Sequence, residues 1–267
     1  MRFYDQRIVI FSRVGAQIQW EVEAEATVLS NVEVEIQRSE AELGPFKTLR
    51  TVDILDTFSF IDKLVPFRAQ NQIIHYRLVA RDKSTGDLVQ QGNTFSLLGQ
   101  LPLDALEIIR QHRVLLEGLN GHPPLRGIEC TIYKKRNFGP PCRSCTDALT
   151  GHVVVSNCKE CHGTGKVLGY YNPINAFLNI QPYPVNLQLT NFGKIEPSDS
   201  QMFLTNFPVL YSGDVIVEPS EKHWRVVRID VTERQRTLVH QLASVTQLKP
   251  DDIVHETLLH SSHLEAL

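Results

Sequence analysis

Hydrophobic and polar residues alternate along much of residues 7–97, which is the period expected of half-buried β-strands. Seven short segments show the pattern: RIVIFS, QIQWEV, VEVEIQRS, FKTLRTV, FSFID, IIHYRLVARD and DLVQQGNTFSL. Turn signals separate them, as in ELGP and KSTGD. The residues predicted to face inward in the second and third segments are Ile18, Trp20, Val22, Val32, Val34 and Ile36. This many short alternating strands predict a β-sandwich.

The period changes at residues 102–118, where apolar residues recur at helical spacing. The predicted apolar stripe contains Leu106, Ile108, Ile109, Leu115 and Leu116, with Arg113 interrupting it. Asp104 is a candidate N-cap, with Glu107 three residues later, and Gly118 is a candidate stop. The sequence therefore predicts one helix, followed by a loop at NGHPPLRG.

The chain becomes β-rich again from residue 127. IECTIYKKR predicts a strand, and AFLNIQPYPVNLQL predicts a long strand broken by Pro182 and Pro184. Residues 214–248 predict three strands joined by short turns, the first turn at PSEKH. We expect the hairpin around that turn to close a small barrel, with an inward set of Val215, Val217, Trp224 and Val226. Residues 256–267 are expected to be a short helix or a disordered tail.

Composition places the chain among ordinary globular proteins and suggests two domains. It has 267 residues, of which 42% are hydrophobic and 21% are charged. The net charge of −3 gives the whole molecule no electrostatic attraction to nucleic acid or to an anionic membrane. No stretch approaches the roughly 18 apolar residues that span a bilayer, and MRFYDQRIVIF does not read as a secretory signal. We expect a reducing compartment and no membrane association.

Four of the five cysteines form two C-x2-C pairs separated by twelve residues: Cys142, Cys145, Cys158 and Cys161. Each pair lets two thiolates reach one ion, and the spacer is long enough for a hairpin that joins the pairs. Glycines after the second pair suit a turn that needs positive φ. The spacing predicts a structural site for Zn²⁺, although the sequence does not separate zinc from iron. Disulfides within so short a spacing would be strained.

A closed shell of four sulfurs favours a structural rather than a catalytic ion, because catalytic sites keep an open position. His152 and His162 lie near the pairs but are not needed as ligands. Cys130 is predicted to be a small buried core residue. His255, His260 and His263 are predicted to belong to a solvated tail rather than to a metal site. The sequence contains no nucleophile elbow, phosphate loop or dinucleotide-binding fingerprint, so no catalytic residue is assigned.

The segment around the cysteines is locally basic. Its basic residues are Arg126, Lys134, Lys135, Arg136, Arg143, Lys159 and Lys166, against Glu129, Asp147 and Glu160. A zinc ribbon with such a face could contact DNA phosphates, with the GYY sequence at 169–171 as the nearest base-stacking candidate. The alternative interpretation is a solvated ribbon or a protein-facing charged patch.

The first 97 residues resemble a fibronectin type III domain. The resemblance rests on Trp20 in the second strand, VEIQRS in the third, and HYRLVARDKSTG in the sixth, with Tyr76 at the usual tyrosine position. CKECHGTGK is similar to one cysteine repeat of the J-domain co-chaperones, which we interpret as shared knuckle geometry. Fibronectin-like domains bind or space other modules and rarely catalyse.

Residues 100–255 resemble structural proteins of tailed bacteriophages, of the kind found at the neck where head joins tail. The matching features are the basic strand before the first cysteine pair, C-x-x-C-H-G-T-G followed by GYYNP, and P-x-L-x-x-G-D-V-I-V leading to W-R-V. The resemblance implies a non-enzymatic virion protein assembled in the host cytoplasm. It also implies a homo-oligomeric ring that contacts portal or adaptor proteins and tail proteins, with possible contact to packaged DNA.

The expected fold is mainly β: a fibronectin type III-like sandwich, a linker helix, and a small β-barrel-like domain that carries a zinc ribbon. The expected boundaries are 1–98 for the sandwich, 99–126 for the linker helix and loop, 127–255 for the barrel-like domain with its ribbon at about 139–168, and 256–267 for the tail. Two other functions stay open: a zinc-ribbon protein that binds nucleic acid, and a module that binds surfaces or carbohydrates.

Overall fold

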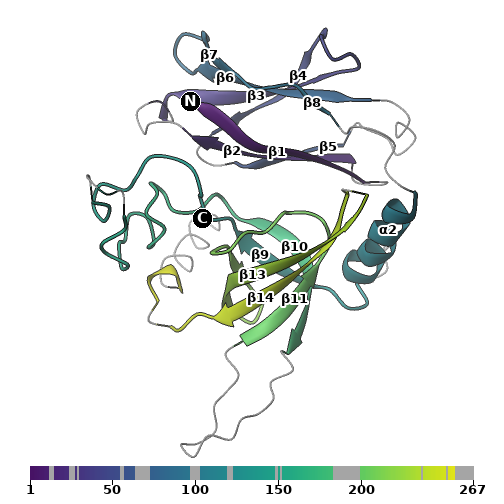
Figure 1. Cartoon of the computed structure of the whole chain (residues 1–267), viewed down its shortest axis with the longest axis vertical. Helices are drawn as coiled ribbons and strands as arrows, with labels where there is room; N and C mark the ends of the chain where they lie inside the picture. The colour runs from purple at the N-terminus through teal and green to yellow at the C-terminus, as the bar shows by residue number, and fades with distance from the viewer. Residues whose placement is uncertain are drawn as a thin grey trace, which may run out of the picture. The chain divides into compact units, whose positions relative to one another are not determined.

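The chain forms two compact units, each mainly β as predicted (Figure 1). The first unit joins Met1–Leu101 with Arg136–Asn172, and the second joins Pro102–Lys135 with Pro173–Leu267. The computed structural model describes residues 1–11, 15–23, 28, 30–54, 57–63, 73–96, 103–118, 123–147, 150, 152–182, 199–235, 237–250 and 252–255.

Two antiparallel sheets make up the N-terminal part of the first unit. One sheet has the order β1 (Arg2–Phe11), β2 (Gly15–Glu23), β5 (Ser59–Asp62). The other has the order β4 (Lys47–Asp53), β3 (Val32–Ser39), β6 (His75–Asp82), β7 (Leu88–Gln91), with β8 (Phe95–Ser96) also paired to β6. The predicted sandwich is confirmed, while its membership of the fibronectin type III family stays a prediction.

The core of the sandwich consists of the alternating residues that the sequence predicts to face inward. Ile18, Trp20, Val22, Val32, Val34 and Ile36 are all buried and belong to one cluster with Tyr76 and Leu78 of β6. A polar cluster also ties the two sheets together: Asp62 of β5 accepts hydrogen bonds from Arg38 Nη1 at 2.8 Å and from the Tyr76 hydroxyl at 3.0 Å. Burial and the neighbouring carboxylate raise the pKa of Tyr76, so its hydroxyl keeps the proton that it donates.

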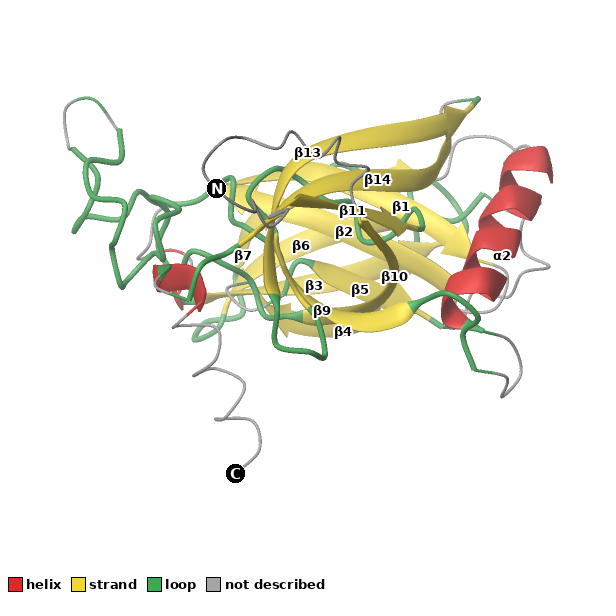
Figure 2. Ribbon diagram, turned by 90° about the horizontal axis from the view of Figure 1, so that it is seen from below, coloured by secondary structure: helices red, strands yellow, loops and turns green. Residues whose placement is uncertain are grey.

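The second unit contains a closed barrel of six strands (Figure 2). Their order is β10 (Ile174–Pro182), β11 (Asp199–Leu204), β14 (Thr237–Gln247), β13 (His223–Arg234), β12 (Val215–Val217), β9 (Ile128–Tyr133). This confirms the predicted barrel and the three strands expected in residues 214–248. β10 ends at Pro182, and the rest of the strand predicted there lies outside the described residues.

The predicted inward set of the β12–β13 hairpin is wrong by one residue on β12. Ile216 stands opposite Trp224 in the pairing, and both belong to the barrel core together with Val226. Val215 and Val217 therefore lie on the other face of β12, because successive side chains point to opposite faces. Val215 is nevertheless fully buried. The VIV run alternates with no polar residue, so its pattern could not reveal which face turns inward.

Helix α2 (Leu103–Glu117) matches the predicted helix and packs against β14 and β10 of the same unit. Its buried residues Ala105, Ile109 and Leu116 lie on one face, whereas Leu115 is 39% exposed. The helix begins at Leu103, so Asp104 lies in its first turn and not at the N-cap. Gly118 ends the helix as predicted, with φ of 78° and its N–H donating to the carbonyl of Val114.

The unit boundaries differ from the expected domains at two places. The segment Arg136–Asn172, which we call the cysteine module, interrupts the barrel in sequence between β9 and β10 but belongs to the first unit. Helix α2 belongs to the barrel unit and does not stand apart as a linker. Residues 97–102 and 119–122, within the predicted linker, and the predicted tail at 256–267 lie outside the described residues.

A buried ion pair lies at the end of β9 in the barrel unit. The Lys134 ammonium donates to Asp214 Oδ2 at 3.3 Å and to the carbonyl of Val209 at 2.8 Å, and both charged side chains are fully buried. Asp214 also accepts the backbone N–H groups of Lys135 and Tyr211, each at 2.8 Å. The Lys134 ammonium also lies 3.8 Å from the centroid of the Tyr211 ring. The pair is therefore compensated by several further contacts, as a buried pair must be.

Asp214→Ala should destabilise the barrel unit by about 3–5 kcal/mol, because it leaves the Lys134 ammonium buried without its carboxylate. Urea unfolding monitored by circular dichroism measures the effect. Glu107→Ala is the matched control, since it breaks an exposed pair with Arg110 on the same unit and should change the free energy of unfolding by less than about 0.5 kcal/mol. Equal losses for the two variants would refute the structural role given to the buried pair.

Candidate metal centre

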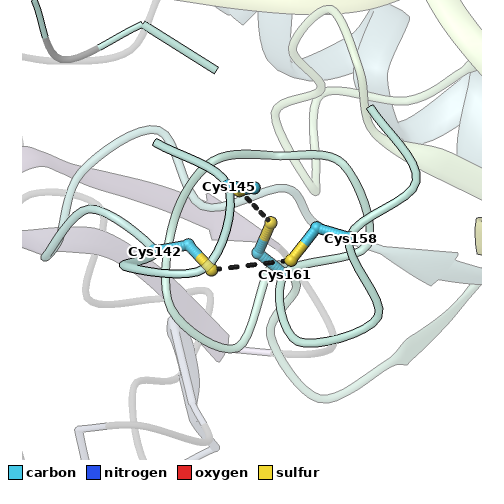
Figure 3. A group of neighbouring side chains, drawn as sticks. All are labelled: Cys142, Cys145, Cys158 and Cys161. Atoms are coloured by element: carbon cyan, nitrogen blue, oxygen red, sulfur yellow. Dashed lines mark hydrogen bonds between the residues drawn. The ribbon is translucent and has the colours of Figure 1, made fainter. Parts of the chain in front are cut away.

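The sulfur atoms of Cys142, Cys145, Cys158 and Cys161 converge in the cysteine module (Figure 3). All four ligand atoms lie within 4.8 Å of one another. The Cys142 and Cys158 sulfurs are 3.7 Å apart, and those of Cys145 and Cys161 are 3.3 Å apart. All four side chains are buried. The prediction that the two pairs lie together is confirmed.

The geometry fits a tetrahedral metal ion. A zinc–sulfur bond of about 2.3 Å places two sulfurs of a regular tetrahedron about 3.8 Å apart. The Cys142–Cys158 distance of 3.7 Å is close to this value, and the Cys145–Cys161 distance of 3.3 Å is shorter. Each close contact joins one cysteine of the first pair to one of the second. An ion at the centre would therefore tie the two ends of the spacer together. Thiolates are soft ligands that suit such a site, and they need a cation to balance their charge.

The second cysteine pair closes on a turn of positive-φ residues, as the glycines predicted. His162, Gly163 and Gly165 have φ of 51°, 75° and 77°. A Cβ at Gly163 would lie 2.6 Å from the carbonyl oxygen of Ser156, so no larger residue fits there without a shift. The Thr164 hydroxyl donates to the carbonyl of Cys161 at 2.7 Å and braces the turn.

Short antiparallel contacts bring the two cysteine pairs together. Thr146 and Val153 form an isolated bridge between the pairs, and the N–H of Val154 donates to the carbonyl of Cys145 at 2.8 Å. The N–H of Cys142 donates to the carbonyl of Gly165 at 2.9 Å. The spacer thus returns as a hairpin, although residues 148, 149 and 151 at its tip lie outside the described residues.

Backbone N–H groups and burial shift the pKa values of Cys158, Cys145 and Cys142 in different directions. N–H groups of Cys161 and Glu160 point at the Cys158 sulfur and lower the pKa of that thiol to about 7, because they stabilise the thiolate. Burial raises the pKa of Cys145 to about 12, and burial also raises the pKa of Cys142. Cys158 is therefore the thiol that deprotonates most readily among these three, while Cys142 and Cys145 need a bound cation to ionise near neutral pH.

Neither the nearby histidines nor the fifth cysteine joins the sulfur cluster. Among the residues that the structure describes, the four cysteines form the one group with metal-ligand geometry. Cys130 lies in the barrel core, where burial raises its pKa to about 12, as expected of a core residue. The His223 and His255 rings are 4.0 Å apart, and His260 and His263 lie outside the described residues. The cluster is thus a closed, all-sulfur shell, which is the arrangement of structural sites.

Aromatic contacts anchor the cysteine module on the sandwich of the first unit. Tyr171 packs against Phe58 with ring centroids 5.3 Å apart, and the Arg136 guanidinium lies 3.9 Å from the Tyr171 centroid. At the other flank, Phe138 stacks on Tyr4 of β1 at 4.5 Å, with 6° between the rings. These contacts were not predicted, because nothing in the sequence links residues so far apart. The aromatic residues that flank the cysteine pairs were the available signal.

The anchoring contacts change how the basic and aromatic residues of this segment are interpreted. Tyr171, considered for base stacking, is only 4% exposed. Lys134 and Arg136, counted in the predicted basic face, are both buried. The Lys166 ammonium donates to the carbonyl of Gly139 at 3.0 Å. The charge available to contact phosphates is therefore smaller than the sequence suggested, which weakens the nucleic-acid interpretation.

Comparison of the chain with models of known protein families gives no match, and a search among curated proteins gives none either. In the described part of the chain, no helix has the length and apolar character needed to cross a membrane.

We expect purified protein to hold one metal ion per chain, and Cys145→Ser/Cys161→Ser to hold none, because two of four ligands are removed. Elemental analysis after dialysis measures the ion. Cys130→Ala is the matched control, since it removes a buried thiol outside the cluster and should keep the full metal content. Wild-type protein without stoichiometric metal would contradict this prediction.

Tyr171→Ala should destabilise the first unit by about 3–5 kcal/mol, the usual cost of removing a buried large aromatic side chain, while the metal content stays unchanged. Tyr170→Ala removes the same kind of group at the adjacent, half-buried position and should cost less. Thermal unfolding combined with elemental analysis separates the two effects. Loss of metal in Tyr171→Ala, or equal destabilisation by both variants, would show that the anchoring assigned to Tyr171 is incorrect.

Proposed function

We propose that this chain is a non-enzymatic structural protein of a tailed bacteriophage virion, located at the neck where head joins tail. One observation supports this proposal: the sequence block that resembles head-closure and connector proteins forms a hairpin of a closed barrel. The block is PVLYSGDVIVEPSEKHWRV, and the hairpin is β12–β13. The second matching block, the cysteine module, interrupts this barrel in sequence between β9 and β10.

The internal construction of the hairpin supports a rigid role. Ile216, Trp224 and Val226 fill the barrel core, and the Trp224 indole N–H donates to the Glu218 carboxylate at the turn. The carboxylate thereby fixes the orientation of the tryptophan next to the tip of the hairpin. A joint that transmits force between head and tail needs rigid elements, in which close packing holds each side chain in one conformation.

We further propose that the ion of the cysteine module is Zn²⁺ with a structural role. Zinc has no redox chemistry of its own and favours a closed tetrahedral shell of four thiolates. The module would then be a stiff projection, because its fold depends on the ion rather than on a large apolar core. Such a projection suits contacts with portal or adaptor proteins and with tail proteins.

The neck surrounds a channel, so we propose that copies of this chain assemble as a homo-oligomeric ring. In such a ring, one surface of each chain binds a different surface of the next chain. Contact with packaged DNA would depend on the basic residues of this segment that stay on its surface. The burial of Lys134, Arg136 and Tyr171 removes the residues best placed for it. The fibronectin-like sandwich would serve as a binding or spacing module on the same chain.

The virion assignment predicts that the protein is present in several copies in purified particles, which quantitative mass spectrometry measures. A phage lacking the gene should accumulate filled heads and finished tails that do not join, and electron microscopy of lysates detects these. Complementation with the wild-type gene should restore joined particles, whereas the Cys145→Ser/Cys161→Ser variant should restore few. Absence of the protein from particles would refute the assignment.

A further inference from the structure

In the described part of the barrel, one edge of β13 lacks a partner strand over much of its length. β13 pairs with β12 only from His223 to Arg225, and the N–H and carbonyl of Val226 then bond to Asp214 and Gly213. From Val227 to Arg234, no described strand pairs with this edge, although the opposite edge of β13 stays paired with β14 up to Arg234 (Figure 2). The unpaired stretch therefore presents a row of backbone donors and acceptors, which is a template for another strand.

The side chains along this edge are exposed and mixed in character. Val227 is 54% exposed and Val231 is 53% exposed, and the Arg228 side chain is 73% exposed. Arg228 donates two hydrogen bonds to Asp230 Oδ1, at 2.8 and 3.0 Å, so these two side chains extend on the same face of the strand. Ile229 points the other way and packs against the barrel core.

We propose that this edge binds the same edge of a second copy of the chain, forming a two-fold antiparallel pair centred on Ile229. A two-fold contact between identical strands brings residues together symmetrically, so the residue at the centre faces its own copy. With Ile229 at the centre, Arg228 of each chain stands opposite Asp230 of the other. Val227 lies at the irregularity of β13 between Val226 and Arg228 and comes nearest to Val231. Within Val227–Val231 the charged residues Arg228 and Asp230 then face each other, whereas Glu233 and Arg234 extend past the open stretch of the partner strand.

Charge disfavours three of the four neighbouring registers. Centring on Arg228 places two arginines opposite each other, and centring on Asp230 does the same with two aspartates. Centring on Val231 sets Arg228 against Arg234. Centring on Thr232 sets Asp230 against Arg234, which is attractive, but it also sets Val231 against Glu233 and leaves Arg228 beyond the end of the partner strand. Because like charges directly opposite destabilise antiparallel pairs, charge disfavours the registers centred on Arg228, Asp230 and Val231. The register centred on Ile229 is favoured over the one centred on Thr232 because it pairs Arg228 with Asp230 without setting an apolar residue against a charge.

This contact does not rest on the virion assignment. A two-fold contact joins chains in pairs through the same surface of each chain. A ring needs contacts between two different surfaces of neighbouring chains. Finding the protein in virions would leave the edge contact undecided, and measuring the edge contact would leave the virion role undecided. The two proposals therefore fail separately.

Charge reversal at the edge tests the contact. We expect wild-type chains to form a reversible dimer in sedimentation velocity experiments. Arg228→Asp and Asp230→Arg should each raise the dimer dissociation constant at least about tenfold, because two symmetric attractions become repulsions. An equimolar mixture of these two variants should recover wild-type association, because each strand then faces its opposite charges. The double variant Arg228→Asp/Asp230→Arg should recover it as well.

The mixture separates the contact between chains from the ion pair within each chain, which stays broken in both single variants. Arg228 and Asp230 both have exposed side chains, so far-UV spectra and thermal unfolding should match wild type for every variant. A wild-type chain that does not dimerise would overturn the proposal. So would single variants that dimerise like wild type, or a mixture no tighter than its components.

Discussion

Convergence of four cysteine sulfurs is the constraint on which the cysteine module depends. In its described residues the module has isolated bridges but no strand or helix, and its only buried cluster consists of the four cysteines themselves. Neither a hydrogen-bonded ladder nor an apolar core of ordinary size is present there to fix the path of the chain. A cation bound by the thiolates would supply the missing free energy and fix the two turns against each other.

The anchoring contacts make the metal centre relevant to the first unit as a whole. Tyr171 and Phe138 lie on either side of the cysteine pairs in the sequence, and they pack against Phe58 and Tyr4 of the sandwich part. Asn137 also donates to Glu21 Oε1 of β2 at 3.1 Å. A module that rigid aromatic rings attach to the sandwich keeps a defined position there, because few side-chain rotations can relax it. A bound ion would stiffen the module further.

The barrel closes although the chain leaves it between the paired strands β9 and β10 to form the cysteine module. The Lys134–Asp214 pair sits where β9 ends, and Asp214 accepts the next backbone N–H after Lys134. The polar groups at this exit are thus satisfied inside the protein. Closure removes the edges of most barrel strands, whereas β13 from Val227 to Arg234 has no described partner strand on one side and keeps its backbone groups available for another strand.

The sequence alone determined the features that depend on local pattern. Period-two alternation identified the strands and the inward residues of β2 and β3, a change of period identified α2, and the C-x2-C spacing identified the four cysteines that cluster.

Tertiary structure decided the features that depend on contacts between residues far apart in the sequence. The VIV run of β12 has no polar residue to mark its faces, so only pairing with β13 shows that Ile216 is the core residue. The sequence predicts Lys134 and Arg136 to be surface charges, but both are buried against residues that lie far from them in the sequence. The attachment of the cysteine module likewise depends on rings more than 100 residues apart, whose contact is set by the packing of the whole unit rather than by any neighbour in sequence.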